Sequence, residues 1–510
     1  MEIFLESVKD VWMWLMEHLV YINLILSVVI VFFQRRDPKA VWTWLLALYF
    51  VPIFGFLLYL VLCQDFRKSR MFRIKEVEDR LRYPIESQEQ RIRKQDKRSG
   101  KTQSREYEDL VLYNLTTSGA VLTLDNQVEV FTDGVEKFRD LVEEMKRAEQ
   151  YIHIQYYIIK NDEVFQAMIP VLEQKAAEGV EVRILYDGMG GRFMPSKVWE
   201  RLKKSGIRVG EFFPAFLGRL QLRVNYRNHR KIVVIDGKVG YVGGFNIGKE
   251  YISRDTKFGY WRDTHLKIRG SAVYSLQIRF ALDWNYAVKE NLFTDGKYFG
   301  LSDEDMLRNT AEMEDTVQIE KGDGVKSGNV GIQIISSGPD ASNRQIRNNY
   351  LQLFHKAKHH IYIQTPYFVP DDAVLSALKI AAESGVDVRL MIPCKPDHPF
   401  VYWASYSYVG DLLAAGARCY TYENGFLHAK AVMVDGMVSC CGTANMDIRS
   451  FELNFEVNAT IFDADVTRKL EEAFIRDLDH CLEVTKERYG ARNLMVRVKE
   501  QCSRLLSPLL

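Results

Sequence analysis

The hydrophobic pattern divides the chain into an apolar N-terminal part and a longer body of short apolar runs. Two long apolar runs, Val11–Phe33 and Val41–Cys63, lie within the first seventy residues. Each is long enough for the roughly 20 helical residues that cross a hydrocarbon core. The short, charged connection Gln34–Lys39 separates them, and no small-residue cleavage site of a signal peptide follows the first run. Residues 1–70 are therefore predicted to form a transmembrane helical hairpin.

The basic residues around this hairpin predict its orientation. Its two outer flanks carry six Lys or Arg residues, whereas the connecting loop carries three. Under the positive-inside rule the rest of the chain then lies in the cytoplasm, as the catalytic body of a multi-pass cell-membrane protein. Residues 71–115 are charged and poor in apolar residues. They are expected to form a spacer that holds the body near the membrane.

The body contains an internal repeat. Residues 148–155 resemble residues 357–364, and residues 176–184 resemble residues 381–390. The same segments recur in the same order, which is the mark of a duplicated structural unit. We therefore expect two homologous halves, 116–301 and 330–510, that form a pseudo-twofold body. The acidic, glycine-containing stretch 302–329 is the expected linker.

Each half alternates β-rich runs with helical patterns. Ile152–Ile159 and Ile361–Tyr367 are predicted strands, and Val164–Glu178 and Asp372–Glu383 are predicted helices. This alternation indicates the α/β class with a mostly parallel sheet.

Composition narrows the function. The formal net charge of +1 argues against bulk electrostatic capture of nucleic acid, so no nucleic-acid partner is expected. The seven cysteines are odd in number and irregularly spaced, which predicts neither a disulfide framework nor a zinc site. The adjacent His359 and His360 precede a strand and are expected to be surface or cap residues rather than ligands. No metal and no other cofactor is expected.

A duplicated constellation carries the candidate chemistry. The first copy comprises His229, Lys231, Asp236, Gly243 and Asn246, and the second copy comprises His428, Lys430, Asp435, Gly442 and Asn445. Strand residues two positions apart share a face, so each His and its Lys would project together into a site. Two lysines and two asparagines would supply positive charge and hydrogen bonds to a phosphate without a metal. Because every offset is matched in both copies, the histidines are interpreted as functional rather than structural.

These residues carry a family resemblance. The pattern His-x-Lys-x-x-x-x-Asp followed by Gly-x-x-Asn, present twice, resembles the phospholipase D superfamily from about Thr116 to the C-terminus. The hairpin loop Arg35–Pro38 and the segments Gly243–Tyr251 and Trp261–His265 extend the likeness. With them the whole chain is similar to bacterial cardiolipin synthases.

The resemblance implies one active site in which the two motifs meet at the interface of the halves. His229 is the implied nucleophile and His428 the implied acid and base. Asp263 is expected to orient His428, and Glu456 to orient His229, although a salt bridge with a neighbour such as Arg262 is the alternative. The catalytic set implied by the resemblance also includes Lys231, Lys430, Asp236 and Asp435. The residues expected to bind phosphate are Asn246 and Asn445. The two aspartates are expected to serve the local architecture of the motif more than the chemistry.

The resemblance also implies the substrates. Two phosphatidylglycerol molecules would give cardiolipin and glycerol through a phosphohistidine, beside a bilayer that holds both lipids. Water or serine as acceptor, or a membrane-tethered nuclease, are the alternatives. The sequence leaves open whether the insertion 214–222 dips into the membrane or packs as a loop, and whether the tail Leu494–Leu510 lies against the body or the membrane. It also leaves the oligomeric state open.

Overall fold

The structure is a computed structural model that describes residues 2–32, 38–53, 55–56, 88, 107–214, 226–298, 328–341, 343–505 and 507. The expected linker 302–329 lies outside the described residues except for its last two positions. The insertion 214–222 lies outside them except for Pro214.

Both N-terminal apolar runs contain helices, α1 (Glu2–Phe32) and α2 (Pro38–Phe50). The two pack against each other through Ile30, Trp44 and Leu48, and the Asn23 amide donates to the Leu48 carbonyl at 3.2 Å. Within the described ranges, no helix combines the length and the apolar content that a membrane crossing requires.

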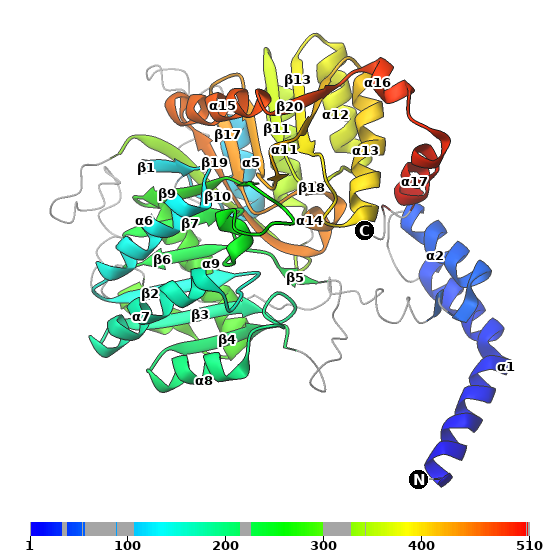
Figure 1. Cartoon of the computed structure of the whole chain (residues 1–510), viewed down its shortest axis with the longest axis horizontal. Coiled ribbons are helices and arrows are strands. Elements are labelled where there is room, and N and C mark those ends of the chain that lie inside the picture. The colour runs from blue at the N-terminus through cyan, green and yellow to red at the C-terminus, as the bar shows by residue number, and fades with distance from the viewer. Residues whose placement is uncertain are drawn as a thin grey trace.

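A single sheet runs through both halves (Figure 1). In the first half the strands lie in the order β1 (Thr123–Phe131), β9 (His265–Arg269), β7 (Val239–Gly243), β6 (Ile232–Ile235), β2 (Tyr151–Tyr156), β3 (Glu181–Asp187) and β4 (Arg208–Phe212). The second half repeats this order with β10 (Val330–Ser337), β19 (Asn454–Phe462), β17 (Val438–Gly442), β16 (Ala431–Val434), β11 (His360–Gln364), β13 (Asp387–Pro393) and β14 (Arg418–Tyr422), and adds β20 (Cys481–Val484) at its edge. Because β1 pairs antiparallel with β10, the halves join edge to edge in pseudo-twofold order.

The expectation of a mostly parallel sheet is wrong. Among the strands named above, β2, β3 and β4, and likewise β11, β13 and β14, pair in parallel. The strands between these triplets are antiparallel. The cause is the turn that ends each motif strand, where Asp236-Gly237 and Asp435-Gly436 adopt positive φ. Such Asp-Gly turns send a strand back along its neighbour.

Helices cover both faces of each half. In the first half, α6 (Gly134–Lys146), α7 (Glu163–Ala177) and α8 (Ser196–Lys204) bury one face, and α9 (Ala272–Val288) buries the other. In the second half, α11 (Gln345–Lys356), α12 (Asp372–Glu383) and α13 (Pro399–Ala414) cover one face, and α15 (Ala464–Leu478) covers the other. Aspartate side chains cap the first turns of α6, α7, α12 and α15, as expected at helix N-termini.

Part of the stretch assigned to the charged spacer belongs to the body. Helix α5 (Glu108–Ser118) buries Leu110 and Val111 in the core of the second half. Its Asn114 amide donates to Gln333 at 3.1 Å and to Asn349 at 2.9 Å. Residues 107–115 are therefore packed structure, because the apolar face of this short helix finds a partner more than 200 residues away in the chain.

Candidate active site

The two motif histidines lie on the seam between the halves. His229 stands between the short strand β5 (Arg227–Asn228) and β6, and His428 stands between β15 (Phe426–Leu427) and β16. Strand β5 pairs with β19 of the other half, and β15 pairs with β8 (Trp261–Arg262). The His229 amide donates to the Phe455 carbonyl at 2.9 Å, and the His428 amide donates to the Arg262 carbonyl at 2.7 Å. Each histidine is thus anchored by the backbone of the opposite half.

The His229 ring contacts the buried Glu456 carboxylate of the second half. Its Nδ1 lies 3.0 Å from both carboxylate oxygens. Thr443 Oγ1 donates to the same carboxylate at 2.6 Å, and Asn454 Nδ2 donates to it at 3.2 Å. An ionised carboxylate only accepts, so the Nδ1 proton of His229 points to Glu456. The lone pair of a neutral His229 then resides on Nε2.

His428 has the mirrored arrangement with the first half. Its Nδ1 lies 2.6 Å from Oδ2 of the buried Asp263. The Thr264 amide donates to the other Asp263 oxygen at 2.8 Å. Lys430 Nζ also lies 2.8 Å from this Nδ1. Because the Asp263 carboxylate only accepts, the Nδ1 proton of His428 points to Asp263, and Lys430 donates to the His428 carbonyl.

A glycine makes room for this carboxylate. A Cβ on Gly244 would lie 1.9 Å from Asp263 Oδ1, so any larger residue would displace the oxygen. The close approach of a functional side chain therefore explains the glycine at position 244. The second copy has Thr443 at the equivalent position.

The two motif lysines form one electrostatic centre. Lys231 and Lys430 are both buried, and Lys231 Nζ donates to the His229 carbonyl at 2.7 Å. Burial, opposed by the charge of Glu456 and helped by that of Lys430, lowers the pKa of Lys231 to about 7. Burial likewise lowers the pKa of Lys430 to about 8, against the attraction of Asp263 and Glu456. The pKa of each lysine therefore depends on charged groups of both halves.

Burial also favours neutral imidazoles. It lowers the pKa of His428 to about 4, helped by the charge of Lys430 and opposed by Asp263. Burial lowers the pKa of His229 too, although Glu456 acts in the opposite direction. Burial alone would raise the pKa of Asp263, but Lys430 and His428 hold it below its usual value. His229 and Lys231 do the same for Glu456. In the protein alone, the carboxylates of Asp263 and Glu456 are therefore anionic, and the imidazole rings that they contact are neutral.

The remaining motif residues are placed differently. Asp236 accepts from the amides of residues 149, 150 and 151, each at 2.8 Å. Asp435 accepts from residues 358, 359 and 360 in the same way. Both follow the last residue of the motif strand, about 20 Å along an extended chain from the histidine that precedes it. Their carboxylates hold the start of a neighbouring strand.

The two asparagines are partly engaged within the protein. Asn246 Oδ1 accepts from the Ile158 amide at 3.0 Å, and its Nδ2 donates to Tyr251 Oη at 3.1 Å. Asn445 Nδ2 lies 3.5 Å from Asp447 Oδ2, and its buried Oδ1 has no hydrogen-bond partner among the described residues. Each amide retains hydrogen-bonding capacity for a ligand.

Sequence reasoning missed the aromatic walls and the buried arginines of this site. The Tyr157 ring lies 5.1 Å from that of His229, and the Trp261 ring lies 5.1 Å from that of His428. Arg230 pairs with the buried Asp283 at 2.6 and 2.7 Å and donates to the Glu456 carbonyl at 3.2 Å. Only the position of Arg230 next to the first motif histidine hinted at a role.

Arg262 does not form a salt bridge with the Asp263 carboxylate, which was the alternative expected from the sequence. Its Nε donates to the Asp477 carboxylate at 2.8 and 3.1 Å, and it reaches Asp263 only at the backbone carbonyl. The Asp263 carboxylate is therefore left to His428. The Arg262–Asp477 pair also crosses the seam, because the two residues come from different halves.

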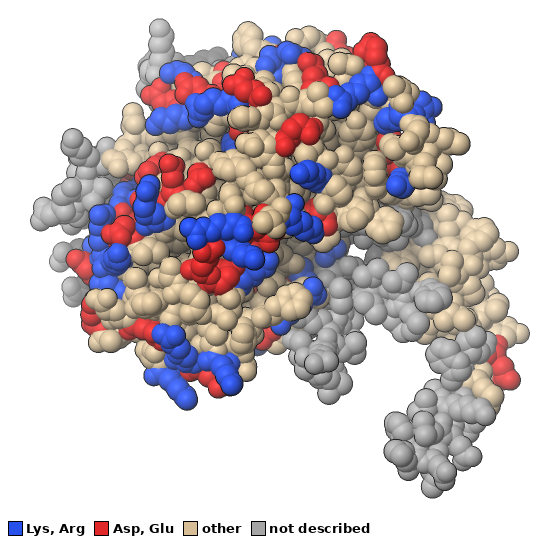
Figure 2. Space-filling view, in the orientation of Figure 1, with Lys and Arg blue, Asp and Glu red and all other residues tan. Residues whose placement is uncertain are grey.

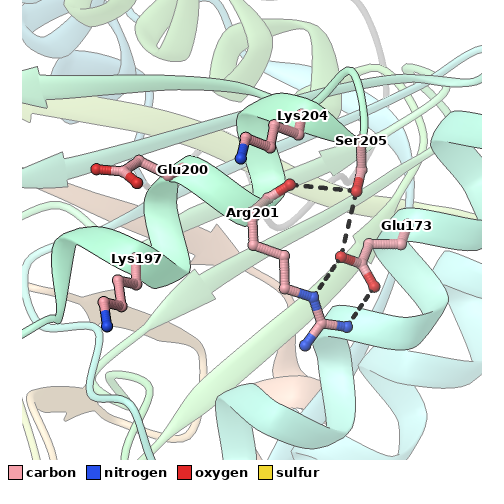
Figure 3. A pocket seen from close by; sticks show the side chains of 6 residues that line it. All are labelled: Glu173, Lys197, Glu200, Arg201, Lys204 and Ser205. Atoms are coloured by element: carbon pink, nitrogen blue, oxygen red, sulfur yellow. Dashed lines mark hydrogen bonds and ion pairs between the residues drawn. The ribbon is translucent and has the colours of Figure 1, made fainter.

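Other candidate sites have less support. Figure 3 shows a surface hollow between α7 and α8 in which Arg201 pairs with Glu173 at 2.7 and 2.6 Å, while Lys197 and Glu200 point elsewhere. No motif residue lines it. In the part of the chain that the structure describes, no group of three or more His, Cys, Asp or Glu residues is arranged to hold a metal.

Models of known protein families match both halves of the body and the N-terminal segment. The family model described as "Cardiolipin synthase, PLD-like domain" matches residues 141–261 and 350–478. The model described as "Phospholipase_D-nuclease N-terminal" matches residues 22–62. Among solved structures, phosphatidylserine synthase of Haemophilus influenzae is similar in fold, with a TM-score of 0.58 at 15% identity over 80% of this chain and 97% of that one.

Relatives of known function match almost the whole chain. Cardiolipin synthase 2 of Staphylococcus epidermidis is 46% identical over 491 residues, which cover 96% of each chain. The major cardiolipin synthase of Bacillus subtilis is 44% identical over 494 residues, which cover 96% of this chain and 97% of that one. On this evidence the chain belongs to the bacterial cardiolipin synthase family of the phospholipase D superfamily.

Proposed function

We propose that this phosphatidyltransferase moves a phosphatidyl group from one phosphatidylglycerol to a second, releasing glycerol and forming cardiolipin. The observation that carries the proposal is that each imidazole gives its Nδ1 to a carboxylate of the opposite half. Both Nε2 atoms then remain for chemistry at a phosphorus atom between them.

In the first step Nε2 of His229 attacks phosphorus, and the bond from phosphorus to the glycerol oxygen breaks. His428, carrying a proton on Nε2, gives that proton to the departing oxygen. The product is a phosphatidyl group bonded to His229, and His428 is left neutral. Splitting the exchange in this way avoids direct attack of one lipid alcohol on an anionic phosphodiester.

In the second step the neutral His428 takes the proton from the free primary hydroxyl of another phosphatidylglycerol. That oxygen attacks phosphorus, the bond from phosphorus to nitrogen breaks, and His229 returns to its starting form. No net proton is gained or lost over the two steps. Lys231, Lys430, Asn246 and Asn445 are proposed to bind the phosphate oxygens, because ammonium and amide groups donate to such anions.

The lipid substrates motivate a proposed membrane anchor. We propose that the N-terminal helices form a hairpin in the bilayer with the body on the cytoplasmic side. Supporting this, large apolar side chains such as Val20, Leu24 and Trp42 are exposed on α1 and α2, as expected of side chains that contact lipid. A cysteine introduced at the exposed Lys197 on α8 permits a test. A membrane-impermeant thiol reagent should label it in opened cells and leave it unlabelled in intact ones, with the unsubstituted chain as the control.

Product analysis tests the reaction. Purified full-length chain with phosphatidylglycerol alone should release one glycerol for each cardiolipin formed. Phosphatidic acid without cardiolipin would identify water as the acceptor, and a serine-dependent product would identify a phosphatidylserine synthase. Acidic and basic side chains are interspersed on the face in Figure 2, which does not favour the nuclease alternative. Cleavage of single-stranded DNA at a rate comparable to lipid turnover would overturn the proposal.

A further inference from the structure

The C-terminal helix α17 (Leu494–Leu505) lies on α13 (Figure 1). The residues of α17 that are fully buried are polar. Glu500 and Ser503 are its buried residues. Arg492 Nε lies 3.2 Å from the Glu500 carboxylate, and the Arg504 guanidinium lies 2.6 Å from the Asp411 carboxylate on α13. Polar contacts therefore fix which face of α17 points away from the body.

The outward face of α17 is apolar. Leu494, Met495, Val498 and Leu505 expose 76%, 68%, 52% and 70% of their surface, and Cys502 is exposed among them. At about 100° per residue these five positions form one stripe roughly 100° wide, which we call the outer stripe. A helix that simply packs on a soluble body turns such a stripe inward. Here the arrangement is reversed.

Cations border the outer stripe on both sides. Arg497 and Lys499 are exposed and lie on opposite margins of the stripe in helical projection. Residues 486–505 contain six Lys or Arg residues against two Glu, and one of these, Glu500, is buried against Arg492. An apolar stripe flanked by cations is typical of helices that lie in the interface of an anionic membrane.

We propose that the outer stripe of α17 binds the surface of an anionic lipid bilayer, with the helix axis in the membrane plane. This contact is separate from phosphatidyl transfer and from the N-terminal hairpin. A second copy of the chain is a poorer occupant, because a symmetric contact would bring the Arg497 and Lys499 cations of two copies together. A bilayer rich in phosphatidylglycerol offers both an apolar interior and negative headgroups.

The contact would also orient the catalytic body. Helix α13, on which α17 rests, begins just after β13, at the carboxyl end of a parallel strand. The motif histidines lie at this same edge, since β16 and β6 start where their antiparallel neighbours β11 and β2 end. Phe400, in the first turn of α13, is exposed. Seating α17 on the bilayer thus brings this edge of the second half toward the lipid.

Cys502 lies within the outer stripe and provides the test. The full-length chain, with its other accessible cysteines changed to serine, is labelled at Cys502 with an environment-sensitive fluorophore and reconstituted in phosphatidylglycerol vesicles. Some lipids carry a nitroxide quencher high on the acyl chain. We expect quenching at Cys502 to exceed, by threefold or more, quenching of the same label at Lys197→Cys, an exposed position on α8. Val498→Ser should reduce it, and the matched surface change Lys204→Ser should not.

The outcomes separate the possibilities. Equal quenching at positions 502 and 197 would overturn the proposal. Disulfide linkage of Cys502 between two copies without lipid quenching would assign the stripe to self-association and overturn it as well. Val498→Ser should keep full transfer activity in detergent micelles, where no bilayer has to be engaged. Failure of the unmodified chain in that micelle assay would count against phosphatidyl transfer and leave the quenching result standing.

Discussion

Changing Glu456 to Gln tests the proposed alignment of His229. The buried Glu456 carboxylate accepts from His229, Thr443 and Asn454. A glutamine of the same shape keeps one acceptor oxygen and replaces the other with an NH2 group. At least one of the three donors then faces another donor. A buried group left without its partner costs about 1–3 kcal/mol, which a protein of ordinary stability survives.

The expected loss of activity is much larger than this stability cost. Replacing the carboxylate that orients a catalytic imidazole lowers kcat by about 10⁴ in another enzyme class, because the ring adopts the wrong tautomer. We expect a fall of about 10³–10⁴ for Glu456→Gln, which corresponds to roughly 4–5.5 kcal/mol of activation free energy. Thr443→Ala removes a different donor to the same carboxylate and is the matched control. It should reduce kcat by less than about tenfold.

Two measurements test this reasoning. Transfer rates in phosphatidylglycerol micelles give kcat, and thermal unfolding shows that the variant is folded. A phosphodiester with a nitrophenol leaving group separates the proposed roles, because that group departs without a proton. With it, His428→Ala should accumulate a phosphohistidine at His229, whereas Glu456→Gln should form it slowly. Activity of Glu456→Gln within tenfold of the parent, in a folded protein, would refute the alignment role, and a phosphohistidine trapped at His428 would reverse the proposed roles.

Three further predictions concern the lysines, the turn aspartate and the seam. Because the pKa values of Lys231 and Lys430 are lowered to about 7 and 8, both lose their protons as pH rises through that range. The pH–rate profile of kcat/KM should therefore fall in two steps, and Lys430→Arg should remove the upper step while the lower one stays. Asp236→Asn keeps a residue that tolerates positive φ but loses part of three backbone contacts, so unfolding should show a loss of about 1–3 kcal/mol with kcat within twofold; a thousandfold fall in kcat would make Asp236 catalytic. Arg262→Met leaves the Asp477 carboxylate buried without its cation, and the free energy of unfolding should fall by about 3–5 kcal/mol, whereas Arg262→Met with Asp477→Leu should recover most of it.

Features of this site that depend on residues close together in the sequence could be predicted, whereas contacts between distant residues could not. The motif residues were recognisable because their offsets match in the two copies. The expectation that each His and its Lys share the face of a strand was wrong, because residues 229–231 and 428–430 lie just before the motif strands. The contacts of His229 with Glu456 and of His428 with Asp263 join residues 227 and 165 positions apart. No periodicity encodes such contacts, and only the family resemblance suggested them.

Other features depend on how the halves dock. Arg230 and Asp283 form a buried ion pair, and Arg230 also donates a hydrogen bond to the Glu456 carbonyl of the other half. The second copy of the motif has Ala429 at the equivalent position, so comparing the repeats gave no signal. The antiparallel centre of the sheet was missed for a different reason. The antiparallel pairing of β6 with β7 and of β16 with β17 depends on two-residue Asp-Gly turns, and such short turns leave the alternation of strands and helices along the chain unchanged.

The pKa of His428, the proposed acid, is lowered in the protein alone and is expected to rise when the substrate binds. In the protein alone, burial disfavours the charged His428 ring, and Lys430, 2.8 Å from its Nδ1, disfavours a second positive charge beside it. A phosphodiester anion placed between the motifs would attract the Lys430 ammonium and add its own negative charge near Nε2. Both effects raise the pKa of His428. The proton for the leaving alcohol is therefore expected to be held by His428 only once a phosphate is bound, which limits the acid form to the complex that uses it.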